Sequence, residues 1–533
     1  MKTYSIASIL FTVGIALFIA CNNGNIGIAE RDTSVTILTS FNNLFLDSAA
    51  IRNFLSKNVQ YKADAEQIFS FYKKRNYEYA WFDSGGLGEQ ASNFMNLLDN
   101  TIGTLQDSSL YSKELNEAYN SFTSSNNVKH RLGEAMNTEL MLTGQFFNYA
   151  AKIYKGTDSS ITDLGWFIPR KKINLTQILD SVVAVKNKSA DEFAPLNEEY
   201  KKLAAFVPVY IKLQKSFTWD SIEKPEKTLH LKETSPIISK VRNRLFILGD
   251  LPVNDSSAVF DSALYKGVVA FQKRNGLGSD GAIGNKMIDA INVTPAQRLQ
   301  QILVNLERLR WMPQHFDSNY IFVNIPEYKM YVYEDAELKF PMNVIVGKTA
   351  TGTTIFSGKL KYIVFSPSWK VPVSIIKNEI LPGIKKNPNY LEKHHMEKTG
   401  GSDSMPVIVQ KPGAFNSLGH IKFLFPNSYD IYFHDTPERS LFTASTRNFS
   451  HGCIRLGEPK KLASFLLKND TSWTSKKIDS CMHLEKEMYV TLKKTTPVYI
   501  GYFTSWVDSS GILNFRPDIY GHDKKLAEKL FSK

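Results

Sequence analysis

The chain has 533 residues, of which 43% are hydrophobic and 22% are charged. This length exceeds what one hydrophobic core supports, so we expect about two to four globular domains and an α+β, multidomain protein. The net charge of +12 comes from basic residues spread along the chain, without an arginine-rich arm. A solvated basic surface therefore explains the charge better than a nucleic-acid site, while anionic lipid or an anionic polymer stays open as a partner.

The first 21 residues have the pattern of a bacterial export signal. A 15-residue apolar run, Ile6–Ala20, is shorter than the roughly 20 residues of a membrane-spanning helix. The Ala20-Cys21 pair resembles a lipoprotein processing site, with Phe18 where leucine is usual. We expect a lipid anchor on Cys21 and a polar tether at residues 22–41, with ordinary cleavage or an uncleaved anchor as alternatives. Each alternative places the protein outside the cytoplasm.

Residues 42–230 are expected to form a mainly helical domain. Apolar residues recur at three- and four-residue spacing in tracts that begin near Ala63, near Glu139 and over Leu196–Leu213. Between the first two tracts, Asn76–Phe82 has the composition of a turn rich in aromatic residues. No pattern in this region points to chemistry, so we interpret it as a scaffold.

Residues 236–292 have the pattern of a separate small module. Ile237–Leu245 and Leu264–Asn275 are amphipathic and predict two helices. Gly281 and Gly284 then favour a tight turn before a third helix. The expected unit is therefore a three-helix bundle.

Residues 293–317 are expected to link this module to the next domain. Thr294 suits the N-cap position of a helix, and Pro295 suits its first turn. The apolar residues that follow recur at helical spacing, which predicts one amphipathic linker helix.

From residue 318 to about residue 500 the hydrophobic period changes to two, which predicts a mostly β domain. A Lys-, His- and Gly-rich stretch at 373–420 breaks that pattern, and a loop of this length is usually functional or mobile. Residues 501–533 form a C-terminal tail. The expected strands are Tyr320–Pro326, Lys329–Tyr333, Met342–Gly347, Lys361–Phe365 and Ile421–Phe425.

The β domain contains one cysteine with two nearby candidate bases. Cys453 follows His451 by two positions, and His434 lies 19 residues upstream in an apolar, strand-like run. Since the thiolate is the reactive form of cysteine, an imidazole close to Cys453 would generate a nucleophile near neutral pH. If Ser450 to Arg455 is extended, His451, Cys453 and Arg455 point the same way. Geometry alone leaves open which histidine is the base.

Two neighbours of Cys453 suit supporting roles. Gly452 lets the backbone turn its amide, with that of Cys453, toward a developing oxyanion. Arg455 can bind a substrate carboxylate in a bidentate way or anchor the loop. Both uses of Arg455 stay open at this point.

These residues carry a family resemblance. His434 and, fifteen residues later, Ser450-His451-Gly452-Cys453 with Arg455 resemble the active-site signature of the L,D-transpeptidases, the YkuD family. Thr436-Pro437 and Arg447 look like the large, periplasmic YcbB-type subgroup. The resemblance implies a YkuD-type β-sandwich at 318–500, a capping subdomain at 373–420 and a helical scaffold domain. Phe271–Leu277 and Asp280–Gly284 resemble a peptidoglycan-binding domain, with a spacer that has lost its ligand groove as the alternative.

The resemblance also implies residue roles. His434 becomes the general base and proton donor for Cys453, with His451 in support. Trp369 becomes a wall of the donor cleft, although a core tryptophan is an equally good interpretation, and Ser450, Arg447 and Arg455 are the further candidates for substrate binding. Asp435 stands where smaller residues occur elsewhere in the family, so the group that orients His434 stays open, a backbone carbonyl being one candidate.

The implied reaction is acyl transfer between peptidoglycan stem peptides. The Cys453 thiolate attacks the carbonyl of the third stem residue, releases the terminal D-amino acid and passes the acyl group from a thioester to an acceptor amine, which makes a 3→3 cross-link. Water as acceptor would give an L,D-carboxypeptidase, and a lipoprotein amine an anchoring enzyme. The resemblance also implies acylation by carbapenem-type β-lactams and a periplasmic location.

Two other classes of protein were weighed. A non-catalytic peptidoglycan-binding lipoprotein would not need the intact set around Cys453. A papain-like peptidase has its nucleophile before its histidine in the chain, whereas His434 precedes Cys453. No cofactor or metal is expected, because the histidines show neither HExxH spacing nor a CxxC pair. Cys481, the third cysteine, is interpreted as a structural thiol.

Overall fold

The computed structural model describes residues 42–105, 107–124, 128–157, 160–170, 172–184 and 190–531. The expected export signal, the lipidated Cys21 and the polar tether lie outside these residues. Contacts divide the chain into two compact units, one built from residues up to 93 with 112–147 and 179–187, the other from 94–111, 148–178 and 188 onward. Within the described segments, no helix combines the length and the apolar character that crossing a membrane requires.

The first unit is helical, as expected, and is organised around one buried carboxylate. Glu139, which is fully buried, accepts hydrogen bonds from the Tyr72 hydroxyl at 2.8 Å and from the backbone N–H of Trp81 at 2.9 Å. Burial raises the pKa of Glu139 to about 7. The turn predicted at Asn76–Phe82 is present, with left-handed backbone at Asn76 and Tyr77. Glu139 therefore fixes the aromatic turn to the helix behind it.

The helices of this N-terminal half differ from the predicted tracts at their ends. The tract from Glu139 lies inside α5, which begins earlier, at Leu132, and continues into a π-turn at Ala151–Lys155. The tract at Leu196–Leu213 is divided into α7 and α8, because Pro208 lacks the N–H that a continuous helix would need and instead occupies the first turn of α8. The elements are α1 Ser48–Lys57, α2 Ala65–Lys74, α3 Glu89–Leu105, α4 Lys113–Ser124, α5 Leu132–Ala150, α6 Leu175–Ala184, α7 Glu198–Ala204 and α8 Val207–Ser216, with the short strands β1 Phe82–Asp83, β2 Gly86–Leu87 and β3 Trp166–Phe167.

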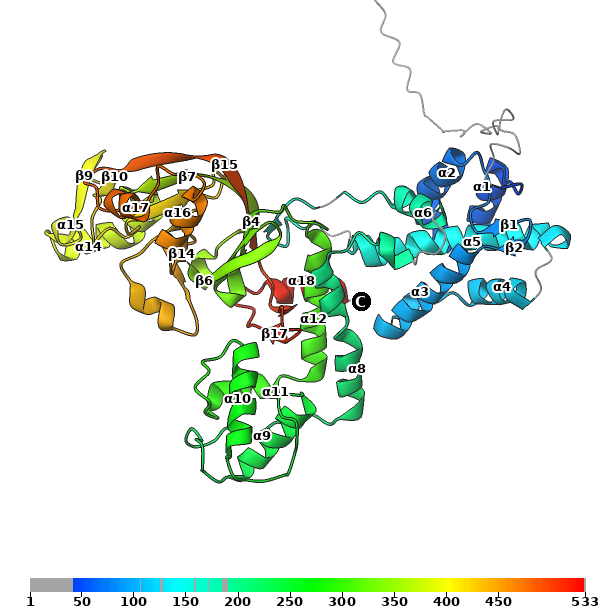
Figure 1. The fold of residues 1–533 in the computed structure, drawn as a ribbon, viewed down its shortest axis with the longest axis horizontal. Helices are drawn as coiled ribbons and strands as arrows, with labels where there is room; N and C mark the ends of the chain where they lie inside the picture. The colour runs from blue at the N-terminus through cyan, green and yellow to red at the C-terminus, as the bar shows by residue number, and fades with distance from the viewer. Residues whose placement is uncertain are drawn as a thin grey trace, which may run out of the picture. The chain divides into compact units, whose positions relative to one another are not determined.

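The module contains the three predicted helices (Figure 1), which are α9 Pro236–Ile247, α10 Ser262–Arg274 and α11 Asn285–Asn292. Ser235 and Asp261 cap the first two with their side chains, each satisfying a free N–H of the first turn. The module has its own core of buried aliphatic and aromatic residues, so it is a domain and not a loop.

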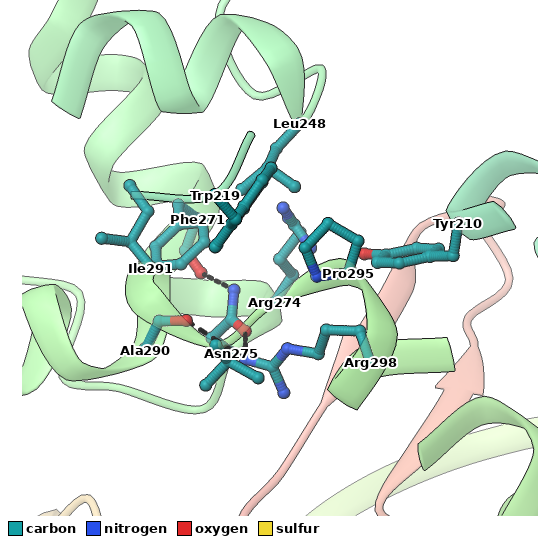
Figure 2. A pocket seen from close by; sticks show the side chains of 11 residues that line it. Tyr210, Trp219, Leu248, Phe271, Arg274, Asn275, Ala290, Ile291, Pro295 and Arg298 are labelled. Atoms are coloured by element: carbon teal, nitrogen blue, oxygen red, sulfur yellow. Dashed lines mark hydrogen bonds between the residues drawn. The ribbon is translucent and has the colours of Figure 1, made fainter. Parts of the chain in front are cut away.

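The module is fixed to the linker helix α12, Pro295–Trp311 (Figure 2). The Arg298 guanidinium donates to the Asn275 side chain at 2.9 Å and lies 4.2 Å from the centre of the Phe515 ring. Arg516 of the C-terminal segment donates to the Arg274 carbonyl at 3.1 Å. The cavity between these residues has a volume of only about 10 Å³, so this face is a packed interface and not a ligand groove.

The β domain predicted from residue 318 onward is built on a ten-stranded sheet whose order is β11-β12-β14-β6-β5-β4-β15-β7-β3, with β13 beside β6. The strand β11 pairs with both β12 and β7, so the sheet closes on itself. All five predicted strands are present, and the cross-strand partners place alternate residues in the core. The strands are β4 Tyr320–Asn324, β5 Lys329–Glu334, β6 Glu337–Gly347, β7 Ile355–Phe365, β11 Ile421–Leu424, β12 Phe433–His434, β13 Asn448–Ser450, β14 Ile454–Leu456 and β15 Met488–Gly501.

The cap is more regular than the sequence indicated. The stretch that breaks the β pattern begins with helical segments but then contains two strands, which join β8, just before the stretch, in a separate three-stranded sheet ordered β8-β10-β9. Val371, Ile376 and Ile408 form part of its separate small core. Its elements are β8 Trp369–Lys370, α13 Val373–Ile375, a π-turn at Ile376–Ile380, α14 Leu381–Lys386, α15 Tyr390–Lys393, β9 Met396–Gly401 and β10 Pro406–Gln410.

The remaining elements lie on and after the sheet. Two helices follow β14, and the C-terminal tail forms a hairpin and a last helix. The hairpin contacts α12, since the Gln301 side chain donates to the carbonyls of Thr504 and Arg516. These elements are α16 Pro459–Leu467, α17 Ser475–Cys481, β16 Ser505–Val507, β17 Leu513–Phe515 and α18 His522–Phe531.

Candidate active site

The register of three strands brings the predicted base and its neighbours to one face of the sheet. His434 on β12 is the Cα partner of Lys422 on β11 and of Arg455 on β14. Directly opposed residues share a face, and so do residues two positions away along the same strand. Tyr432 and Cys453 directly precede β12 and β14, and Tyr432 is hydrogen-bonded to the Cys453 sulfur. The sheet places a thiol, an imidazole, a phenol and two cations together.

The segment that carries Cys453 is bent, which corrects the extended conformation considered from the sequence. The Ser450 hydroxyl donates to the Cys453 carbonyl at 2.5 Å and accepts the Gly452 N–H at 3.1 Å. Gly452 has a φ of +120°, which L side chains rarely adopt, and its carbonyl accepts the Thr353 hydroxyl at 2.8 Å. Residues 451–453 therefore turn, and the expected alternation of His451, Cys453 and Arg455 does not occur.

The Cys453 thiol is half-buried and contacts the loop that precedes β12. Its sulfur lies 3.5 Å from the Asp430 carbonyl oxygen. Burial raises the pKa of Cys453 to about 11, although hydrogen bonds from the backbone and hydroxyl of Tyr432 and the charge of Arg455 act to lower it. The sulfur therefore carries its proton at neutral pH and needs a base at the moment of attack.

His434 is 5% exposed and is oriented by a backbone group. Its Nδ1 lies 2.5 Å from the Asp435 carbonyl oxygen, which can only accept, so Nδ1 carries the proton and Nε2 is free as a base. This carbonyl is the orienting partner that the sequence left open. Burial and the charge of Arg455 lower the pKa of His434 to about 3, so the imidazole is neutral at neutral pH. A neutral acceptor thus accompanies a neutral thiol.

The second histidine of the motif is directed to the cap. His451 Nε2 lies 2.7 Å from the Glu379 carboxylate, which belongs to the π-turn of the cap, and 3.4 Å from the Lys348 ammonium. His451 therefore links the Cys453 segment to the cap, a use that the sequence did not indicate.

Three of the expected substrate-binding residues already have protein partners. Arg447 donates to the backbone carbonyls of Val344, Ala444 and Tyr328, and Arg455 forms an ion pair with Glu438. The hydroxyl of Ser450 is used inside the turn. This arrangement favours anchoring roles for these side chains, whereas Trp369 lines a pocket of about 340 Å³ together with Tyr432.

Sequence reasoning missed three residues of the site, namely Tyr432, Lys422 and Glu379. Tyr432 was accessible, because it stands two positions before His434 and period-two alternation puts both on one face. Lys422 is a lone cation in an apolar strand, which is unusual, but the sequence does not indicate which residue lies beside it. Glu379 reaches the site through the fold of the cap, and no local pattern indicates this.

Family models match two parts of the chain. Residues 318–500 match the L,D-transpeptidase catalytic domain of the YkuD family, and residues 66–206 match a scaffold domain. The catalytic match contains every residue of the site described above. The scaffold match covers most of the helical region in which no chemistry was found.

Individual relatives give the same family name. A candidate L,D-transpeptidase of Haemophilus influenzae is 34% identical over 242 residues, which are 43% of this chain and 49% of that protein. The chain thus spans about half the length of the curated relative it matches. Among solved structures, LdtMt1 in complex with imipenem is 15% identical over 35% of this chain and 59% of its own, with a TM-score of 0.20. A Xylanimonas cellulosilytica L,D-transpeptidase is 13% identical, covers 52% of this chain and 100% of its own, and has a TM-score of 0.18.

Proposed function

Residues 318–500 form an L,D-transpeptidase catalytic domain of the YkuD family, and on that premise we propose that this chain is a peptidoglycan L,D-transpeptidase with Cys453 as its nucleophile. The observation that carries the proposal is that two neutral groups lie around Tyr432, which is hydrogen-bonded to Cys453 and whose ring centre lies 5.7 Å from that of His434. Cys453 is held as a thiol, and His434 is held as an imidazole with Nε2 unprotonated. This is the pair that general-base activation of a cysteine requires.

In the proposed first step, Nε2 of His434 takes the thiol proton as the Cys453 sulfur attacks the carbonyl carbon of the third stem residue. A C–S bond forms, the C–N bond to the terminal D-amino acid breaks, and the imidazolium returns the proton to the leaving amine. A thioester on Cys453 results. Because His434 is buried beside the cations of Arg455 and Lys422, the imidazolium is short-lived, which favours prompt proton return.

The oxyanion of this step needs backbone donors. The Gly452 N–H already donates to the Ser450 hydroxyl at 3.1 Å, so the Cys453 amide is the better candidate of the two. The role of Gly452 is then to turn the chain, through its φ of +120°, so that the following amide faces the sulfur side.

In the proposed second step, the side-chain amine of another stem peptide attacks the thioester carbonyl and releases Cys453, which gives a 3→3 cross-link. Hydrolysis by water, an L,D-carboxypeptidase activity, is the competing outcome. A periplasmic location with a lipid anchor at Cys21 fits this substrate, and the module at 236–292 is proposed as a glycan-binding unit. Acylation by carbapenems is expected by analogy with the neighbour solved with imipenem.

The proposal is tested by intact-protein mass spectrometry after incubation of residues 22–533 with imipenem. We expect one adduct on the unmodified sequence and none on Cys453→Ala. Cys481→Ala is the matched control, because Cys481 is the other free cysteine of the described residues and is buried. An adduct that persists in Cys453→Ala, or no adduct on folded protein whose thiol titrates as free, would contradict the proposed nucleophile.

A second assay separates the two acceptor outcomes. A tetrapeptide stem donor is incubated with and without a stem acceptor that carries a free side-chain amine. A cross-linked product supports the transpeptidase, whereas tripeptide alone supports the carboxypeptidase. Neither product, from protein that does form an imipenem adduct, would point to a different donor.

A further inference from the structure

The pocket beside Trp369 lies where the cap joins the catalytic sheet. It has a volume of about 340 Å³, and its lining includes Trp369 and Lys370 of β8 from the cap, with Lys422, Tyr432 and Tyr489 from the sheet side. Aromatic side chains thus form part of its walls, and charged groups lie among them. A volume of this size accommodates one amino-acid side chain.

Two residues connect the pocket with the site around Cys453. Tyr432 lines the pocket and is also hydrogen-bonded to the Cys453 sulfur. Lys422 lines the pocket and is the cross-strand partner of His434. A group carried by an acyl chain on Cys453 therefore has this pocket directly beside it.

Lys422 is the most buried charge of the pocket, and the opposing charge that acts on it is that of the exposed Glu487, which forms no ion pair with it. Lys370 and Glu487 are exposed, whereas Lys422 is half-buried and its pKa is lowered, chiefly by burial. In the described part of the chain, no carboxylate lies within the 4.0 Å of an ion pair to Lys422. Glu487, the carboxylate of the pocket, accepts the Ser368 backbone N–H at 3.1 Å. A half-buried cation that forms no ion pair is stabilised when a ligand supplies a carboxylate.

We propose that this pocket binds a carboxylate of the peptide donor, with the Lys422 ammonium as its partner and the rings of Trp369 and Tyr489 against the attached carbon chain. The inference rests on the proposed function and names the substrate group that this part of the site selects. Two carboxylates flank the scissile bond: the side-chain carboxylate of a third residue that has one, and the terminal carboxylate of the fourth residue. Lys422 is on this proposal a specificity-determining residue.

The test compares three tetrapeptide donors, which are fully free, amidated at the side chain of the third residue, or amidated at the C-terminus. We expect one amidation to lower kcat/KM by about 10- to 100-fold, the range for loss of a charge-assisted hydrogen bond. Whichever amidation does so identifies the carboxylate. In Lys422→Met the ratio between free and amidated donors should fall to within about threefold, because both donors then meet a pocket without the Lys422 ammonium.

The ratio within one variant cancels any effect of Lys422 on the chemistry of His434. Lys359→Met, an exposed lysine of β7 outside the pocket, is the matched control and should keep the full ratio. Lys422→Arg, which retains a cation, should restore part of the ratio. The inference would be overturned if wild type used the free and both amidated donors with equal kcat/KM, or if the ratio between donors persisted in Lys422→Met. Lys422 would then act only through its electrostatic effect on His434.

Binding to Cys453→Ala separates this inference from the proposed function. Calorimetry with the same three donors needs no turnover. We expect the same single amidation to lower the affinity for Cys453→Ala. In Cys453→Ala/Lys422→Met that amidation should leave the affinity unchanged. If imipenem forms its adduct but amidation changes nothing, the pocket assignment fails and the proposed function stands. If binding discriminates but no acylation occurs, the proposed function fails and the pocket assignment stands.

Discussion

The Glu379 carboxylate lies 2.7 Å from Nε2 of His451, so a residue of the cap contacts the segment that carries Cys453. Glu379 belongs to the π-turn Ile376–Ile380, a conformation that is frequent at functional sites. Both side chains are partly exposed, so the pair contributes little to the stability of the fold. Its main effect is to hold the cap against the segment that carries Cys453.

Glu379→Gln should lower the rate of tetrapeptide acylation by about three- to tenfold while changing the stability by less than about 1 kcal/mol. The amide keeps the shape of the side chain but removes the charge that holds His451. Single-turnover acylation and thermal denaturation measure the two effects. Glu392→Gln, an exposed carboxylate on α15 of the same cap, is the control and should change neither. Equal acylation rates in the two variants would mean that the contact between Glu379 and His451 does not contribute to catalysis.

Tyr432→Phe should raise the pKa of the Cys453 thiol above its value of about 11, because the Tyr432 hydroxyl is one of the groups that lower it. At pH 8 the thiolate fraction falls, so alkylation by iodoacetamide should slow by about two- to tenfold. The measurement is the pH dependence of alkylation in a Cys481→Ala background, which removes the second free thiol. An unchanged profile would mean that the phenol does not act on the sulfur.

Asp435→Asn should destabilise the catalytic domain by about 2–3 kcal/mol. The Asp435 carboxylate is 1% exposed, accepts backbone N–H groups from His420 at 2.9 Å and Thr436 at 2.7 Å, and forms an ion pair with Arg439. The neutral amide loses the ion pair and turns a donor toward one of these N–H groups. Urea denaturation gives the difference in unfolding free energy.

Arg439→Met is the comparison for this variant. Because Arg439 is half-exposed, water replaces part of its interaction with Asp435. Arg439→Met should therefore lower the unfolding free energy by less than Asp435→Asn does. Asp435 also supplies the carbonyl that orients His434, so slower acylation should accompany the loss of stability. If Asp435→Asn is as stable as the wild type, the stabilising effect of the carboxylate comes from the hydrogen bonds of the two N–H groups and not from the ion pair.

The sequence predicted those parts of the domain in which one strand face is buried. Residues 320–323 and 329–333 alternate because the pleat buries every second residue, and the pattern is therefore local. Cys453 and His434 were found because their chemistry is rare in sequence. Residues 451–453 were not found to be bent, because the Ser450 and Thr353 hydroxyls hold the bend, and Thr353 is 99 residues from Gly452.

The strands of the cap and the row of Lys422, His434 and Arg455 depended on relations between distant segments. Met396–Gly401 is mostly exposed, so its side chains show no alternation, and pairing with Pro406–Gln410 makes it a strand. Lys422 meets His434 through a strand register, and a shift by one residue would turn one of them to the other face. A single sequence contains no record of such a register.

Lowering the pH should destabilise the catalytic domain through His434. Its folded pKa is about 3 against an ordinary value of 6.5, because burial and the neighbouring charges of Arg455 and Lys422 oppose the cation. Between pH 6.5 and 3 the unfolded chain binds a proton that the folded domain does not, so stability falls as the pH falls through this range. The largest possible loss is roughly 5 kcal/mol, and only part of it, about 2 kcal/mol, is reached by pH 5.

Urea denaturation at pH 7.5, 6.5, 5.5 and 5.0 measures this loss, with wild type compared at each pH with His434→Gln. Glutamine cannot titrate, so the stability of His434→Gln should fall less on acidification than that of the wild type. The difference between the two proteins separates the effect of His434 from those of Glu139 and of His522, whose pKa burial lowers to about 4. His230→Gln, an exposed histidine of another domain, should follow the wild type. Parallel curves for wild type and His434→Gln would mean that the folded pKa of His434 lies near its ordinary value of 6.5, which would contradict the lowering by burial and by the neighbouring cations.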